Sequence, residues 1–225
     1  MRRKLGVVLL GSGIAVIAWV AVTLVWGDPV TSLYTLREQS ALAAQLDRVS
    51  ARLAVPKPPG GRARPAKNTA ALLRARALRF RKQLHDGDPV GRIHIPRIHL
   101  DAVVVEGTTT RDLERGPGHY TAASGVATSL PGLGNVVAIA GHRTTFLHPF
   151  RHIDQLRSGD SVYLKMPYGT FRYRVYFKKV VLPYDWSILR QRPYEKLVLT
   201  ACHPLYSASH RLAVFARLVG STAAH

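Results

Sequence analysis

The strongest constraint on the fold is a series of short apolar runs with a period of two that begins at residue 88. Side chains alternate between the two faces of a strand, so this pattern predicts strands that each bury one face. In "TFRYRVYFKKVVL" we expect Phe171, Tyr173, Val175 and Phe177 on one side. The other runs are "GRIHIPRIHL", "DAVVVEG", "GNVVAIAGH", "DSVYLKM", "EKLVLTAC" and "RLAVFARLVG". Seven or eight short strands separated by Gly, Pro and Ser favour a small all-β barrel or sandwich.

Helical signals within this β region are short, at 111–116, 150–156 and 186–191. No glycine-rich loop opens onto a long helix, which argues against a nucleotide-binding α/β sheet. The β region therefore has the strand content of one domain with a few single-turn helices.

The N-terminus carries an uncharged run of 22 residues, 5–26, directly after the basic "MRRK". As a helix this run spans about 33 Å, enough to cross the hydrocarbon core of a bilayer. A cleaved signal peptide usually has an apolar core of only about 7–15 residues. We therefore expect an uncleaved anchor, with the N-terminus inside because Arg2, Arg3 and Lys4 abut the helix.

The segment between the anchor and the β region is basic and lacks the two-residue period. Apolar residues at helical spacing predict a helix over 31–54, the Pro- and Gly-rich stretch 55–68 reads as a linker, and 69–84 reads as a basic helix. The basic helix 69–84 is interpreted as a solvated spacer or as a surface attracted to an anionic membrane or wall. The net charge of +19 is also compatible with nucleic-acid binding as a function, but the sequence has no recognisable nucleic-acid recognition motif.

The single cysteine, Cys202, follows the apolar run "KLVLTA" at the expected end of a strand. A small buried hydrophobic residue is the simplest alternative for a lone cysteine. Strand ends are, however, where rigid scaffolds present reactive groups, and a thiol needs a base or a cation to act as a nucleophile. His142 ends a second apolar strand and is the best partner, whereas His203 points to the opposite face from its neighbour Cys202.

Arg211 begins the strand after Cys202, separated from it by "HPLYSASH", a stretch of hairpin length. An antiparallel return would bring Arg211 level with Cys202, where a fixed cation could stabilise an oxyanion. A zinc site built from "HRTTFLH" and "CH" is also conceivable, although its spacing matches no familiar pattern. The sequence thus offers a thiol, an imidazole and a guanidinium for one site, and no cofactor or metal is expected.

The stretch "GPGHY…PGLGNVVAIAGHRTTFLHPF…LVLTACHP…SASHRLAVFARL" resembles the sortases, membrane-bound cysteine transpeptidases of Gram-positive bacteria, and is most similar to class E of the actinobacteria. The resemblance covers about residues 88–220 and implies a closed eight-stranded barrel. It implies His142, Cys202 and Arg211 as catalytic residues, with Thr200, Ala201 and Tyr120 binding substrate. Ala201 stands where the family usually has Thr.

The resemblance further implies cleavage between Thr and Gly of an LAXTG- or LPXTG-like C-terminal signal through a thioacyl enzyme. The implied partners are secreted proteins with such signals and an amine of the peptidoglycan cross-bridge or its lipid-linked precursor. The expected division is a cytoplasmic tail 1–4, an anchor 5–26, a stalk 27–87, an extracellular catalytic barrel 88–220 and a tail 221–225. A non-enzymatic, membrane-anchored module that binds cell-wall polymers is the alternative function.

Overall fold

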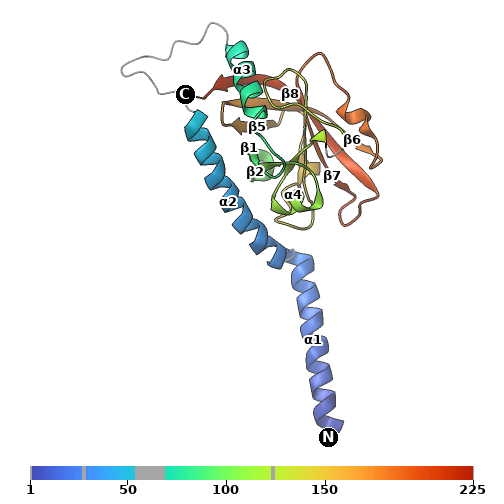
Figure 1. The fold of residues 1–225 in the computed structure, drawn as a ribbon. Coiled ribbons are helices and arrows are strands. Elements are labelled where there is room, and N and C mark those ends of the chain that lie inside the picture. The colour runs from blue at the N-terminus through green and yellow to red at the C-terminus, as the bar shows by residue number, and fades with distance from the viewer. Residues whose placement is uncertain (1, 27–28, 54–68, 123–124, 225) are drawn as a thin grey trace.

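Eight strands close into a barrel in the computed structural model, which describes residues 2–26, 29–53, 69–122 and 125–224 (Figure 1). The order around the barrel is β1-β2-β3-β4-β7-β8-β6-β5. The strands are β1 Pro89–Ile95, β2 Leu100–Glu106, β3 Gly118–His119, β4 Val136–Ala140, β5 Ser161–Met166, β6 Gly169–Val181, β7 Lys196–His203 and β8 His210–Ala223. The predicted barrel is therefore confirmed.

The strands β4 and β7 lie side by side and run parallel, whereas most neighbouring pairs are antiparallel. All five residues of β4 are buried, and so are the first six of β7. Strands covered on both faces read as unbroken apolar runs, which is why "VVAIA" and "LVLTA" lack the alternation of the other strands. This parallel pair is the rigid base on which the site described below is built.

The strand β6 departs from the expected alternation at its midpoint. Phe171, Tyr173 and Val175 are buried as predicted, but Phe177 is 53% exposed. The register against β8 shifts between Val175 and Phe177, which marks a bulge. An extra residue in one strand reverses which side chains face inward beyond it, so the prediction for Phe177 was wrong.

The short helices lie close to where the sequence predicts them. They are the helix α4 Thr110–Arg115 and the single turns η3 Ile153–Gln155 and η4 Trp186–Leu189, and a further turn, η1 Pro96–Ile98, was not predicted. The helix α4 begins at a capping box, in which Thr109 and Asp112 satisfy each other's backbone N–H groups. This box fixes the connection from β2 to β3 beside the barrel mouth.

Two longer helices, α2 Pro29–Leu53 and α3 Thr69–Arg81, pack against the barrel, so α3 does not form the expected solvated spacer. In α2, Leu42 and Leu46 bury against Val103 and Val105 of β2. The helix α3 places Leu73, Ala77 and Phe80 in the main core. The stretch 27–87 therefore differs from the expected stalk where it is described, because apolar side chains on both helices reach the barrel. The predicted linker 55–68 lies outside the described residues.

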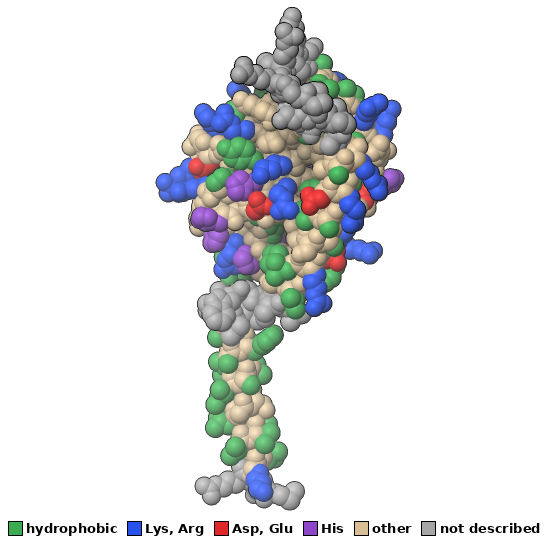
Figure 2. Space-filling model, turned by 90° about the vertical axis from the view of Figure 1, so that its left-hand side faces the viewer, with side chains coloured by type: hydrophobic (Ala, Val, Ile, Leu, Met, Phe, Trp, Pro, Cys, Tyr) green, Lys and Arg blue, Asp and Glu red, His purple; other side chains and the backbone are tan. Residues whose placement is uncertain are grey.

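The helix α1 Arg2–Trp26 contains the segment Lys4–Ala21, with a mean hydropathy of 2.0 and none of it buried. By length and composition it is able to cross a membrane, and within the described residues it is the one helix that passes this test. Figure 2 shows hydrophobic side chains around this helix, while the charged side chains lie mostly on the rest of the molecule.

Candidate active site at the ends of β4, β7 and β8

The parallel pair β4 and β7 brings two predicted site residues to the same edge of the barrel. Ala140, the last residue of β4, is level with Thr200 of β7, and the N–H of Gly141 donates to the carbonyl of Thr200 at 3.0 Å. His142 and Cys202 each follow two residues later. Because parallel strands end at the same side of a sheet, both side chains reach one rim.

Arg211 joins them through the antiparallel pairing of β7 with β8, in which Cys202 is directly opposite Arg211. The Nη1 of Arg211 donates to the carbonyls of Ala208 and His210, each at 3.0 Å. These bonds hold the guanidinium at the start of β8. The hairpin therefore supplies the cation at the level of the thiol, the arrangement that the sequence predicts.

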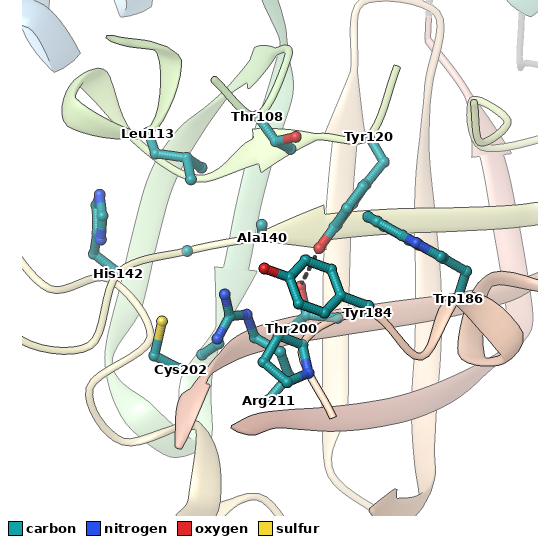
Figure 3. Close-up of a pocket in the computed structure, with 13 residues that line it drawn as sticks. Thr108, Leu113, Tyr120, Ala140, His142, Tyr184, Trp186, Thr200, Cys202 and Arg211 are labelled. Carbon is teal, nitrogen blue, oxygen red and sulfur yellow. Dashed lines mark hydrogen bonds between the residues drawn. The ribbon is translucent and has the colours of Figure 1, made fainter. Parts of the chain in front are cut away.

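Cys202, His142 and Arg211 line one cavity of about 340 Å³. In Figure 3 the sulfur of Cys202 lies between the ring of His142 and the guanidinium of Arg211. Cys202 is half-buried and free, so it is neither sealed in the core nor fully exposed. Its position at a cavity argues against the alternative of a buried structural cysteine.

A second cavity, of about 270 Å³, adjoins the first and also borders His142 and Cys202. Its other walls come from the connection between β7 and β8, including Pro204, Tyr206 and Ser207. The thiol and the imidazole therefore lie between two cavities and border both of them.

The three predicted substrate-binding residues also border the first cavity. The phenol of Tyr120 is 2.9 Å from the hydroxyl of Thr200, a hydrogen bond drawn in Figure 3. Burial raises the pKa of Tyr120 above its ordinary value, so it stays neutral. Ala201 is 3% exposed and packs in the main core, so it contributes little more than backbone to the cavity.

The imidazole of His142 is partly withdrawn from water. Its Nε2 is buried and has no hydrogen-bond partner among the described residues. Burial lowers the pKa of His142 below its ordinary value, and the nearby carboxylate of Glu114 partly opposes that shift. Neutral imidazole is therefore the favoured form near pH 7, free to accept a proton.

Arg143 is a site residue that the sequence reasoning missed. It is 5% exposed, and its guanidinium donates to the carbonyl of Arg151 at 3.1 Å and to Asp154 at 3.0 Å. A further donor lies 3.4 Å from the carbonyl of Cys202. Arg143 thus ties the loop after β4 to the backbone that carries the thiol. The one feature of the sequence that could have pointed to Arg143 is its place directly after His142. Arginines are rarely buried unless their charge is paired.

The far wall of the first cavity was also missed, because it comes from the connection between β6 and β7. Tyr184 and Trp186 line it, and the rings of Trp186 and Tyr120 meet edge to face with centroids 6.5 Å apart. Leu113 of α4 closes the opposite side. The sequence marked this connection only as a short helix and gave no reason to fold it back over β7.

The conceivable zinc site is not assembled in this arrangement. His203 faces Arg143, whose Nη1 lies 3.5 Å from its Nδ1. Among the residues that the structure describes, no three His, Cys, Asp or Glu side chains gather closely enough to hold a metal ion.

Comparison with known proteins agrees with this geometry, because the sortase domain family matches residues 93–219. The chain belongs to the sortase family. Sortase D of Bacillus subtilis (strain 168) is 36% identical over 119 residues, which are 52% of this chain and 56% of that protein. Sortase SrtE1 of Streptomyces coelicolor is 30% identical over 146 residues, or 59% of this chain and 41% of that protein. The chain thus spans about half the length of these relatives.

Among solved structures, Sortase E1 from Streptomyces coelicolor, with a tripeptide in its active site, superposes on this sortase with a TM-score of 0.58. The two are 28% identical, and the match covers 61% of this chain and 91% of the other. Sortase E from Streptomyces avermitilis matches with a TM-score of 0.53 and 32% identity, over 62% of this chain and 93% of that one. The relatives include sortases D and E alike.

Proposed function

We propose that this sortase is a cysteine transpeptidase in which Cys202 is the nucleophile, His142 the proton-transfer group and Arg211 the oxyanion donor. The observation that carries the proposal is the convergence of these three side chains on one cavity from the ends of three neighbouring strands. A thiol, a base and a fixed cation are the parts that acyl transfer through a thioester requires.

In the first half-reaction, the imidazole of His142 takes the proton of the Cys202 thiol, and the sulfur attacks the carbonyl carbon between Thr and Gly of a sorting signal. A carbon–sulfur bond forms, and the oxyanion is stabilised by the guanidinium of Arg211. The carbon–nitrogen bond then breaks, and the imidazolium gives its proton to the departing glycine amine. The products are a thioacyl enzyme and the released C-terminal fragment.

In the second half-reaction, an amine attacks the thioester, the carbon–sulfur bond breaks, and a new amide forms. His142 takes the proton that the amine loses and returns it to the sulfur. We assign the sorting signal to the larger cavity, which Tyr120, Thr200 and Trp186 border, and the amine to the smaller one beyond the thiol. Because the sorting signal and the amine would use different cavities, the amine can approach Cys202 while the acyl chain stays bound.

The proposed substrates are secreted proteins with an LAXTG-like signal, and the proposed acceptor is an amine of the peptidoglycan cross-bridge or its lipid-linked precursor. The preference for LAXTG over LPXTG rests on the resemblance to class E. The proposed location is the cell membrane, with α1 as a single-pass anchor, a cytoplasmic N-terminus and the barrel outside. Tethering concentrates the enzyme where membrane-held substrates arrive.

The test is to incubate the full chain, in detergent micelles, with LAXTG and LPXTG peptides and to follow cleavage and the acyl-enzyme mass by mass spectrometry. We expect the wild type to cleave LAXTG faster and to gain the mass of the acyl fragment. Cys202→Ala should form no adduct, release no glycine fragment and keep the thermal unfolding temperature of the wild type. Continued cleavage by the Cys202→Ala variant refutes the mechanism, and faster cleavage of LPXTG refutes the assignment of the signal.

A further inference from the structure

The loop that carries His142 is backed by the helix α2, which follows the apolar helix α1 in the chain. The N–H of Phe146 lies 3.4 Å from the hydroxyl oxygen of Thr31, in the first turn of α2. Further along, Leu36 and Leu147 both line a hollow of about 260 Å³. The helix and the loop are therefore neighbours, although more than a hundred residues separate them in the sequence.

The ring of Phe146 is the part of this loop that touches the imidazole. The two ring centroids lie 5.3 Å apart, with an angle of 37° between the planes. Three successive residues of this loop have a positive φ: 52° at Phe146, 59° at Leu147 and 36° at His148. Residues other than glycine rarely adopt this left-handed conformation, so three in succession need support from their surroundings.

The helix α2 is itself held firmly to the barrel beside this loop. Gln39 donates to the carbonyls of Val103 and Arg115 at 3.0 and 2.7 Å, and it accepts from the N–H of Val103 at 2.7 Å. Thr35, 1% exposed, donates to the carbonyl of Glu114 at 2.7 Å. Glu114 is also the carboxylate that acts on His142. One helix thus holds both the aromatic and the acidic neighbour of the imidazole.

We propose that α2 positions His142, with Thr31 and Phe146 as the positioning residues, so that the segment between the apolar helix and the barrel takes part in catalysis. The inference rests on the proposed role of His142 in proton transfer. Thr31 holds the loop, the loop holds the Phe146 ring against the imidazole, and the ring limits both the rotation of His142 and its contact with water. A small displacement of a proton-transfer group costs turnover more than it costs substrate affinity.

The test uses the full chain in detergent micelles with three changes. Phe146→Leu removes the ring but keeps an apolar side chain, Thr31→Val removes the acceptor but keeps the shape, and Thr31→Ser restores the acceptor. Ser40→Ala is the matched control, because among the residues that the structure describes its hydroxyl bonds within α2, to the carbonyl of Leu36. Each variant is assayed for kcat and KM with an LAXTG peptide and for thermal unfolding.

We expect Phe146→Leu to lower kcat about tenfold and to change KM less than about twofold, since general acid–base help is worth about 10²–10⁴ in rate. Thr31→Val should have a smaller effect of the same kind, and Thr31→Ser should restore the wild-type rate. The unfolding temperature should stay near that of the wild type. Equal kcat values for wild type, Phe146→Leu and Thr31→Val overturn the inference, as does an equal loss in Ser40→Ala.

An NMR titration of His142 gives a readout that needs no substrate. Glu114 on α4 acts on it, and the charged and titratable groups that line its two cavities are Tyr120, Tyr184, Cys202, Arg211, Arg143 and Tyr206; none of them is changed in the variants. Phe146→Leu should let water reach the ring and raise the pKa of His142 toward its ordinary value. If the wild type cleaves no peptide, the proposed function fails, and an unchanged pKa in Phe146→Leu separately refutes the positioning role.

Discussion

The two ends of the parallel pair β4 and β7 differ in how their buried polar groups are hydrogen-bonded. Before the strands begin, the buried carboxylate of Glu195 accepts from the phenol of Tyr173 at 2.5 Å and from the N–H groups of Gly132 and Gly134 at 2.9 and 3.0 Å. Where the strands end, Cys202 borders two cavities and the buried Nε2 of His142 has no partner among the described residues.

The difference separates groups that stabilise the barrel from the groups that we propose react. A buried polar network in which every acceptor is used rigidifies a core. A buried nitrogen without a partner carries a free-energy cost, and such costs are tolerated at functional sites. Substitutions at the Glu195 end should therefore change stability, and substitutions at the Cys202 end should change turnover.

The largest expected effect is at the reactive end. His142→Gln should lower kcat/KM for an LAXTG peptide by about 10²–10⁴, because it removes the group that accepts and returns the proton. The unfolding temperature should not fall, since the lost nitrogen has no hydrogen bond to lose. Steady-state kinetics with a thermal unfolding scan measure both. A drop in stability without a drop in turnover would reverse the comparison.

At the Glu195 end, Glu195→Gln should cost about 1–3 kcal/mol of stability, because an amide replaces one of two acceptor oxygens and leaves a buried donor unpaired. For a domain of this size that corresponds to a fall of roughly 2–12 °C in Tm. Turnover at 25 °C should stay within about twofold of the wild type, about 0.4 kcal/mol. A large loss of kcat with an unchanged Tm contradicts the structural role.

The pH dependence of kcat/KM tests the proposed role of His142 at the Cys202 end. Proton transfer needs a single proton shared between thiol and imidazole, so kcat/KM should be bell-shaped, with its acid limb at the pKa of His142. Burial lowers that pKa, so the limb should lie below about 6.5, the ordinary value for histidine. Glu114 favours the imidazolium, so Glu114→Gln should move the limb to lower pH. A limb that moves to higher pH contradicts the assignment.

The smallest effect is expected at Tyr120. Like Glu195 it has a hydrogen-bonded side chain, and like Cys202 it borders the larger cavity. Tyr120→Phe removes the hydrogen bond to Thr200 but keeps the ring that meets Trp186. Loss of one such bond is worth about 0.5–1.5 kcal/mol. If Tyr120 contacts the sorting signal, KM should rise more than kcat falls, whereas Thr200→Val should leave KM closer to the wild type. Peptide titrations of both variants decide this.

Much of the site could be predicted from the sequence because it depends on where strands end. The runs ending at His142 and Cys202, and the hairpin-length stretch before Arg211, mark three strand boundaries. Once the strands pair as neighbours, the three side chains must share a rim. Local pattern also predicted the short helices and most inward-facing residues of β6, but it could not predict the bulge that exposes Phe177.

The sequence by itself determined the strand-rich domain, its apolar N-terminal helix and the candidate reactive groups, because alternation, run length and a lone cysteine are local properties of the chain. Only the tertiary structure decided that α2 and α3 pack on the barrel, that Arg143 reaches the carbonyl of Cys202, and that the ring of Phe146 lies beside that of His142. These contacts join segments far apart in the chain. Their existence depends on how whole elements pack, which no short stretch of residues encodes.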